Sequence, residues 1–278
     1  MSKNASALRA DLITLFKTLS RTASVPFVVK DATAAKETRF GGSPWLPDDV
    51  LWPEQDGERM SFVCQIEMCH FDGLYGLPRE GLMSVFIGAE YEEDGEDSCV
   101  MILDTSLPGG VRPAFDCPYY GEEHRVSAWL SREDFPHHED IDAIVDDRGV
   151  QVDNSIFAPM AGEHDEDGAA LPIMSQYFSK VRLKSGVLMD EEEALRENAE
   201  YHHHCIERVK IGGWPFWMQG NETPNDKTGN PMAPVLQLNE DGPFGMEPDD
   251  AVEMGPTGIG QVFWSKATGE LRYIWACS

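Results

Sequence analysis

The chain has 278 residues, and its 49 acidic against 22 basic side chains give a formal net charge of -27. Such a charge repels nucleic acid phosphates and the anionic surface of a membrane, so the sequence disfavours both partners. A hydrophobic content of 41% supports a sizeable core and argues against global disorder. The acidity fits recognition of a basic protein or a cation, or a general adaptation of the surface for solubility.

Residues 1–20 carry apolar side chains at helical spacing, which predicts a short amphipathic helix instead of an export signal: Leu8, Leu12, Leu15, Phe16 and Leu19. The sequence has no run of about 18 apolar residues that would predict a membrane-spanning helix. The six cysteines form no C-x-x-C pair and do not resemble a secreted disulfide framework. We therefore expect a soluble, cytoplasmic protein with reduced thiols.

Two parts of the sequence repeat the same signals in the same order, which predicts an internal duplication. Each part has a basic residue, an apolar residue, Gly-Gly, Pro and an aromatic residue, then a strand-like run around a glutamine, then a second strand-like run after a glycine. The paired segments are 39–46 with 210–217, 60–67 with 232–239, and 81–86 with 258–263.

Strand signals dominate both repeats. Apolar residues alternate at period two from Met60 to Met68, as on one face of a half-buried strand. Asp94-Gly95 and Thr268-Gly269 lie between strand-like runs and indicate hairpin turns, because glycine tolerates the positive φ that such turns need. We predict an α+β fold that is β-rich and internally duplicated, with peripheral helices and a loop-rich central segment.

A second helix is predicted directly before the second repeat. Asp190 and Glu193 form a capping box, apolar positions continue on one face to Val209, and Gly212-Gly213 would end the helix. We expect a single compact domain over residues 1–278. Its predicted parts are a helix at 1–20, a first β module at 35–104, a loop-rich insert at 105–188, a helix at 190–209 and a second β module at 210–278.

The repeated segments resemble the YwqG-like family of bacterial proteins. The residues that carry the resemblance are Phe40-Gly41-Gly42-Ser43-Pro44, Leu46-Pro47, Trp52-Pro53, Phe62-Val63-Cys64-Gln65-Ile66, Leu77-Pro78, Gly81, Phe86, Ile211-Gly212-Gly213-Trp214-Pro215, Met218-Gln219 and Leu236-Gln237-Leu238. The resemblance implies a compact α+β fold and a bacterial, cytoplasmic origin. The function of that family is unassigned, so the resemblance implies no catalytic residue.

Two clusters have the residue types of metal sites but not their spacing. Residues 202–205 (His-His-His-Cys) are consecutive, whereas a helical metal pair needs ligands at i and i+4. Residues 163–168 begin like a calcium loop, but Met174 stands where a bidentate carboxylate is required. We therefore predict no metal and no cofactor.

The sequence offers little for nucleophilic or acid–base catalysis. It contains no G-x-S-x-G elbow, no S-x-x-K motif and no P-loop lysine motif. Residues 137–140 (His-His-Glu-Asp) could hold an acid–base group, but the acidic surroundings favour an exposed segment.

Two glutamines and several aromatic residues are the candidate ligand-binding groups. Gln65 and Gln237 lie inside apolar strands, where a buried amide requires partners. Each could bind the Gly-Gly backbone of its own module, which we favour, or the two could share a ligand. If a small-molecule site exists, we expect it in a cleft between the modules lined by some of the tryptophans Trp45, Trp52, Trp214 and Trp217 and approached by Gln65, Gln237 or Gln219. The alternative is that these tryptophans are core residues packed under loops.

We interpret the sequence as a non-catalytic binding or protein-interaction module that recognises a basic protein or a small polar ligand. One alternative is a metal-independent, hydrolase-like enzyme acting on small molecules. Another is an acidic inhibitor or immunity-type protein that neutralises a basic partner by charge complementarity.

Overall fold

The structure is a computed structural model that describes residues 19–29, 35–88, 98–113, 123–137, 140, 205–239 and 258–277. Contacts divide the chain into two compact units, residues 1–21 with 133–205 and residues 22–132 with 206–278. Most of the described residues belong to the second, which we call the β unit. The single compact domain expected from the sequence stays a prediction.

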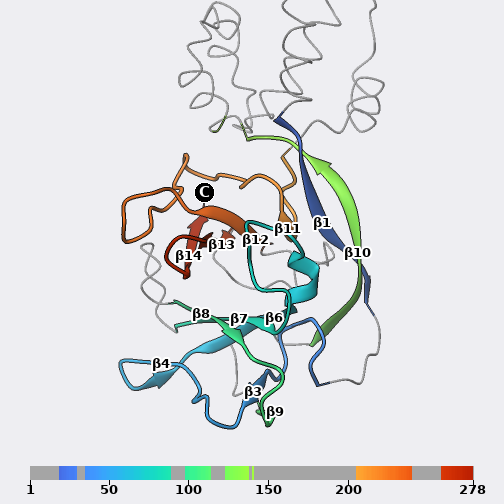
Figure 1. Cartoon of the computed structure of the whole chain (residues 1–278), viewed down its shortest axis with the longest axis vertical. Helices are drawn as coiled ribbons and strands as arrows, with labels where there is room; N and C mark the ends of the chain where they lie inside the picture. Colours follow the sequence, from blue (N-terminus) through green and yellow to red (C-terminus); the bar gives the residue numbers. More distant parts are fainter. Residues whose placement is uncertain are drawn as a thin grey trace, which may run out of the picture. The chain divides into compact units, whose positions relative to one another are not determined.

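Ten strands form one hydrogen-bonded sheet (Figure 1). Their order is β14 (Glu270–Cys277), β13 (Gly258–Ser265), β12 (Ala233–Asn239), β11 (Lys210–Gly212), β1 (Arg21–Val29), β10 (His124–Asp134), β2 (Arg39–Phe40), β6 (Ser61–Glu67), β7 (Leu82–Ile87) and β8 (Ser98–Leu103). The end strands β8 and β14 contact each other, so the sheet folds back on itself. Shorter elements are β3 (Trp45–Pro47) paired with β9 (Gly109–Val111), β4 (Glu54–Gln55) paired with β5 (Glu58–Arg59), and the 3-10 helix η1 (Met68–Phe71).

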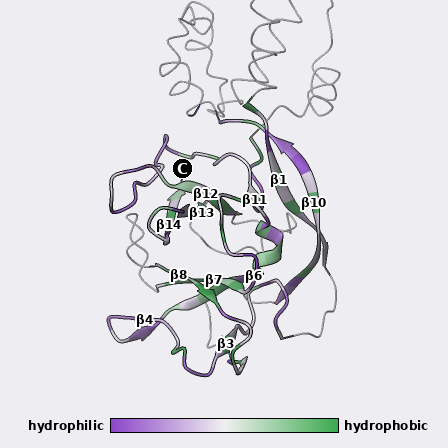
Figure 2. Cartoon of the chain, viewed as in Figure 1, coloured by the Kyte–Doolittle hydropathy of each residue, from purple (hydrophilic) through white to green (hydrophobic). Residues whose placement is uncertain are grey.

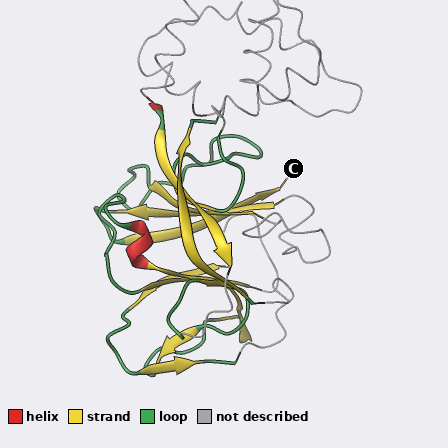
Figure 3. Ribbon diagram, turned by 90° about the vertical axis from the view of Figure 1, so that its right-hand side faces the viewer, coloured by secondary structure: helices red, strands yellow, loops and turns green. Residues whose placement is uncertain are grey.

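The sheet contains two sets of four strands with the same order and register. We call β2, β6, β7 and β8 the first quartet and β11, β12, β13 and β14 the second quartet. Arg39 lies opposite Gln65 in the first, and Lys210 lies opposite Gln237 in the second. Each glutamine strand has a register shift at the same place, between Phe62 and Cys64 and between Pro234 and Leu236. Figures 1 and 3 show the quartets as two layers of the β unit. A common origin by duplication stays a prediction.

Two strands outside the quartets, β1 and β10, link the quartets to each other. β1 precedes the first quartet in the chain but pairs with β11 of the second, with Ala23 opposite Gly212. β10 follows the first quartet but pairs back with its β2, with His124 opposite Phe40. The two quartets are therefore joined into one sheet through the pair β1 and β10.

The main core lies between the two quartets, because one hydrophobic cluster contains side chains of both, including Ile66, Val85, Leu238 and Val262. Smaller clusters cover the outer faces, around Phe62, Leu82 and Phe86 in the first quartet and around Trp217, Met232 and Phe263 in the second. In Figure 2 the strands of the first quartet are largely hydrophobic, whereas β4 is hydrophilic.

The expected one-faced strand from Met60 to Met68 is wrong. Met60 and Phe62 belong to the outer cluster, whereas Cys64, Ile66 and Met68 belong to the main core. The register shift at Val63 inserts one residue and turns the following side chains to the other face. Both faces of β6 are consequently buried.

Each Gly-Gly pair lies at the end of the first strand of its quartet, in a backbone conformation that favours glycine. The φ angles are 65° and 69° at Gly41 and Gly42, and 72° and 78° at Gly212 and Gly213. A Cβ atom at Gly42 would lie 2.5 Å from the Glu123 carboxylate, and one at Gly212 would lie 3.2 Å from the Thr22 carbonyl oxygen. Positive φ and close neighbours together explain why these positions are glycine.

The predicted α+β class is wrong, because the described part of the chain is built of strands, and apart from single helical residues at Leu19 and Asp140 its helical structure is the one turn of η1 (Figure 3). Most of the predicted helices, 1–20 and 190–209, lie outside the described residues. Residues 205–209 are described, and they are irregular instead of helical. Their carbonyl groups bind a side chain of β12, and residues 210–212 pair with β12 and β1, so tertiary contacts override the local helix signal. Among the described helical residues no segment is long and apolar enough to span a bilayer.

We predict that Gly212→Ala lowers the free energy of unfolding by about 1–2 kcal/mol, because an L-residue is strained at this φ. Gly110→Ala is the matched control, since a Cβ atom added there would have no other atom within 4 Å and its φ is not in the positive range. Its effect should stay within about 0.5 kcal/mol. Urea denaturation of both variants measures the difference, and equal stabilities would contradict the assigned backbone strain.

Candidate functional site

Each quartet contains a buried glutamine that binds the main chain on both sides of its Gly-Gly turn. In the first quartet, Gln65 Oε1 accepts a hydrogen bond from the Trp45 N–H at 2.8 Å, and Nε2 donates to the Glu37 carbonyl at 3.2 Å. Gln65 has no exposed surface. The side chain therefore bridges the segment before β2 and the segment after Gly42, an arrangement that we call the glutamine clamp.

The second quartet repeats the glutamine clamp. Gln237 Oε1 accepts from the Phe216 N–H at 2.8 Å, at the position that matches Trp45. Its Nε2 donates to the carbonyl oxygens of Ile206, Glu207 and Arg208 at 2.9, 2.8 and 3.1 Å. The role favoured from the sequence placed such bonds on the Gly-Gly backbone itself, whereas the described bonds go to the main chain on either side of it. Ligand binding by Gln65 or Gln237 stays a prediction.

A buried cation stands beside each glutamine clamp. Arg39 is 1% exposed, and it donates to the carbonyl oxygens of Ser43 at 2.9 Å and Ala35 at 2.8 Å. Its guanidinium also lies 3.4 Å from the Glu123 carboxylate. Burial lowers the pKa of Arg39, and the charge of Glu123 opposes that shift. Lys210 is equally buried at the matching position. The repeated basic residue before each Gly-Gly was the sequence signal for this pair.

The first-quartet tryptophans lie in the outer hydrophobic cluster. Trp45 is 1% exposed, and the Lys36 ammonium lies 4.4 Å from the centroid of its ring. Trp52 donates its indole N–H to the Met60 carbonyl at 2.8 Å and meets the ring of Phe86 edge to face. Both side chains pack on the outer face of the first quartet.

The second-quartet candidates are distributed differently. Trp217 stacks on Phe263 at 6.1 Å between ring centroids, Trp214 is buried, and Gln219 is exposed. Trp217 and the pair Trp45 and Trp52 belong to separate hydrophobic clusters on different quartets. The structure thus brings together Trp45 with Gln65, and Phe216 with Gln237, but does not join the tryptophans of both quartets in one cluster. The predicted cleft between the modules stays a prediction.

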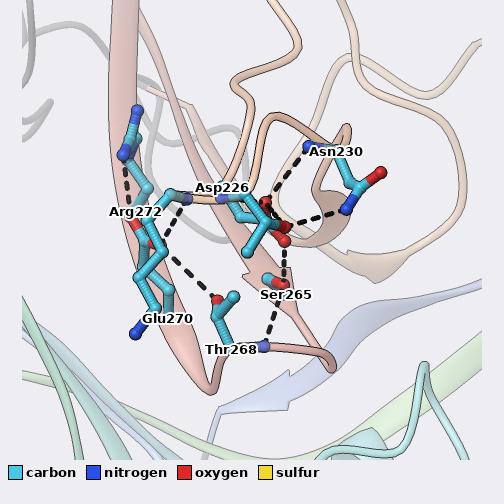
Figure 4. Close-up of polar contacts among 8 residues, drawn as sticks. Asp226, Asn230, Ser265, Thr268, Glu270 and Arg272 are labelled. Atoms are coloured by element: carbon cyan, nitrogen blue, oxygen red, sulfur yellow. Dashed lines mark hydrogen bonds and ion pairs between the residues drawn. The ribbon is translucent and has the colours of Figure 1, made fainter.

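A polar network that the sequence analysis missed ties the loop before β12 to the β13–β14 hairpin (Figure 4). Asp226 is 5% exposed and accepts hydrogen bonds from the Ser265 hydroxyl at 2.6 Å, the Thr228 hydroxyl at 2.6 Å and the Asn230 N–H at 3.1 Å. Bonds from Ser265 and then Thr228 hold the pKa of the Asp226 carboxyl well below its usual range. The spacing D-x-T-G-N could have indicated the turn, but only the fold brings Ser265 to it.

A second carboxylate supports the same loop. Glu270 accepts from the Arg272 guanidinium at 2.7 Å and from the Lys227 N–H at 3.1 Å. The bond from Arg272 is the main cause that lowers the pKa of Glu270. The polar atoms of this network bond to one another, so the arrangement suits loop anchoring better than catalysis.

Three large apolar side chains are exposed on segments that meet at β3 and β9. Leu51, Leu107 and Val111 are 86%, 40% and 46% exposed. Main-chain hydrogen bonds from Asp48 to Pro108 at 2.9 Å and from Arg112 to Pro44 at 2.8 Å hold the two segments together. We call this part of the surface the apolar tip. No sequence signal separated these residues from the neighbouring core residues.

The remaining candidate chemistry is only partly described. The acidic segment 163–168 and His202, His203 and His204 lie outside the described residues, and Cys205 is half-buried. His137 and Asp140 are buried, contrary to the exposure expected for that segment. Within the described ranges, no group of three or more His, Cys, Asp or Glu side chains has the geometry of a metal site.

We predict that Gln65→Leu lowers the free energy of unfolding by about 2–4 kcal/mol, because it leaves the buried Trp45 N–H and Glu37 carbonyl without their shared partner. Gln55→Leu on the β4–β5 hairpin is the control and should change stability by less than about 0.5 kcal/mol. Chemical denaturation compares the two variants. A Gln65→Leu protein as stable as the control would contradict the clamp.

We predict that the difference in stability between the wild type and Asp226→Asn shrinks in acid. The folded Asp226 carboxyl has a lower pKa than the unfolded one, so its ionisation stabilises the fold above about pH 4 and this contribution is lost as the pH falls. Urea unfolding from neutral pH down to about pH 3 measures the difference. Asp49→Asn, in an exposed loop, controls for the loss of one charge, and an unchanged difference across this range would refute the prediction.

Comparison with known proteins identifies the family of the chain but no activity. A search of curated proteins found no match. A family model described as a domain of unknown function, DUF1963, matches residues 38–266. This match includes Gln65 and Gln237, the apolar tip, and Asp226 with its partner Ser265. The chain therefore belongs to the DUF1963 family.

Proposed function

We propose that the chain is a non-catalytic binding protein that docks a basic, amphipathic segment of another protein on the apolar tip. The observation that carries this proposal is the exposure of Leu51, Leu107 and Val111 on hydrogen-bonded neighbouring segments. Exposed apolar groups are typical of interaction sites where they form one patch, whereas single exposed ones are common, and the proposal takes these three as one patch. Burial of a leucine side chain against a partner contributes about 1.5–3 kcal/mol before the costs of association.

The charge beside the apolar tip favours a basic partner. Asp48 and Asp49 are exposed in the loop after β3, and Asp104 is exposed shortly before Leu107. Hydrogen bonds from Ser106 lower the pKa of Asp104, which keeps this carboxylate charged at neutral pH. Two cations lie nearby: Arg112 is 3.6 Å from Asp48, and Lys36, which donates to the Thr105 carbonyl, also lowers the pKa of Asp104. Carboxylates around an apolar centre would steer a basic partner and fix its orientation.

The other functional hypotheses stay open at a lower level of support. An inhibitor or immunity-type role shares the basic partner and is a special case of the same proposal. No contact among the described residues favours a hydrolase-like enzyme. We further propose that the chain is YwqG-like, of bacterial origin and cytoplasmic. The DUF1963 match is compatible with these proposals.

The proposal predicts selective binding of a short synthetic Leu/Lys amphipathic peptide. Leu51→Ser combined with Leu107→Ser should weaken its binding by about tenfold or more, because both apolar contacts are lost. Asp48→Asn combined with Asp49→Asn should mainly slow association and reduce its salt dependence. Surface plasmon resonance at two salt concentrations measures both effects.

Two comparisons separate docking from general charge attraction. A Ser/Lys peptide of equal charge should bind more weakly than the Leu/Lys peptide, and a Leu/Glu peptide should not bind. Glu80→Gln combined with Glu222→Gln removes two exposed carboxylates elsewhere and is the matched control. Equal binding of the two basic peptides, or equal loss in both charge variants, would reject the apolar tip as the docking surface.

A further inference from the structure

The outer face of the second quartet contains a buried polar site separate from the apolar tip. The segment at Phe216 is held from both sides, since its N–H donates to Gln237 Oε1 at 2.8 Å and its carbonyl accepts from Gln261 Nε2 at 2.6 Å. The next residue, Trp217, stacks on Phe263 with an angle of 14° between the ring planes. Gln261 and Phe263 alternate along β13 on the same face. Trp217 and Gln261 are thus close neighbours.

Two polar atoms at this site have no hydrogen-bond partner among the described residues: the indole Nε1 of Trp217 and the amide Oε1 of Gln261. The two side chains are 4% and 5% exposed. The orientation of the Gln261 amide is fixed, because the Phe216 carbonyl can accept only from its nitrogen. The site therefore offers one buried donor and one buried acceptor. Buried polar groups normally have partners, so a small bound molecule or a buried water would satisfy this pair.

The first quartet lacks this pair of groups at the matching positions. Ser84 lies opposite Gln65 as Gln261 lies opposite Gln237, and its buried hydroxyl also has no described partner, but it offers no amide. Leu46 stands at the position of Trp217, and the ring that packs on Phe86 is that of Trp52, whose indole N–H already donates to Met60. The shared architecture of the quartets does not require the donor and the acceptor, which are particular to the second quartet.

We propose that Trp217 and Gln261 bind a small, neutral, planar molecule with an amide-like edge, such as a lactam or a heteroaromatic amide. Its carbonyl oxygen would accept from Trp217 Nε1, and its adjacent N–H would donate to Gln261 Oε1. Met232, Phe263 and Ile274 supply apolar contacts. Trp217 and Gln261 are almost fully buried, and an ionised group is costly to bury, so a neutral ligand is favoured over an ionised one.

The test uses 2-pyridone, whose ring nitrogen and carbonyl present this edge, and N-methyl-2-pyridone, which lacks the donor. In protein carrying 15N-labelled tryptophan, the Trp217 indole resonance is assigned by its disappearance in Trp217→Phe. We expect 2-pyridone to shift this resonance saturably, with a Kd on the order of millimolar or tighter. N-methyl-2-pyridone should bind at least about threefold more weakly, and Gln261→Met should weaken 2-pyridone binding by about 3- to 10-fold.

Ser84→Ala, at the matching position of the first quartet, is the control and should leave 2-pyridone binding unchanged. The comparison of the two pyridones needs only the wild-type protein, so it decides the proposal even if Gln261→Met fails to fold. No shift of the Trp217 resonance, or equal affinity for both pyridones, would overturn the proposal. A cross-peak between the Trp217 indole proton and water that persists with 2-pyridone present would assign the site to a buried water instead.

Discussion

The glutamine clamp is the interaction on which the architecture of the β unit depends. One buried amide binds the strand-like segments before and after a Gly-Gly turn, so the turn, the first strand and the outer cover of each quartet are fixed together. A main-chain N–H or carbonyl left unpaired in the core costs about 1–3 kcal/mol. The two glycines turn the chain out of the sheet, so β-sheet pairing does not reach some of the main-chain N–H and carbonyl groups beside the turn. The glutamine side chain forms hydrogen bonds with these groups instead.

The pairing of β1 with β11 and of β10 with β2 makes the two quartets mutually dependent. β1 precedes the first quartet in the chain and pairs with the first strand of the second, whereas β10 follows the first quartet and pairs with the first strand of that quartet. Separation of the quartets would expose the edges of β2 and β11 and the apolar faces that share the main core. Cooperative unfolding of the β unit is the physical consequence.

The outer faces are the parts of the quartets that differ. Both are covered by the chain that follows the Gly-Gly turn, but the first continues into the apolar tip and the second into the site at Trp217 and Gln261. The two quartets share the same strand register. The segments that cover their outer faces can differ in sequence, because the side chains of these segments do not contribute to that register. We therefore associate binding with the covering segments and stability with the sheet.

The repeated order of Gly-Gly, glutamine strand and second strand could be predicted from the sequence, because glycine conformation, buried amides and strand alternation are local properties of the chain. The sequence also indicated that Gln65 and Gln237 bind their own Gly-Gly loops. Local signals failed at Val63, where a register shift redirects the side chains, and at residues 205–209, where Gln237 binds carbonyl groups that a helix would have used. Tertiary contacts alone set the pairing of β1 and β10, the exposure of Leu51 and the meeting of Trp217 with Gln261. Each of these depends on contacts between residues far apart in the chain, and such contacts leave no periodic trace in the sequence.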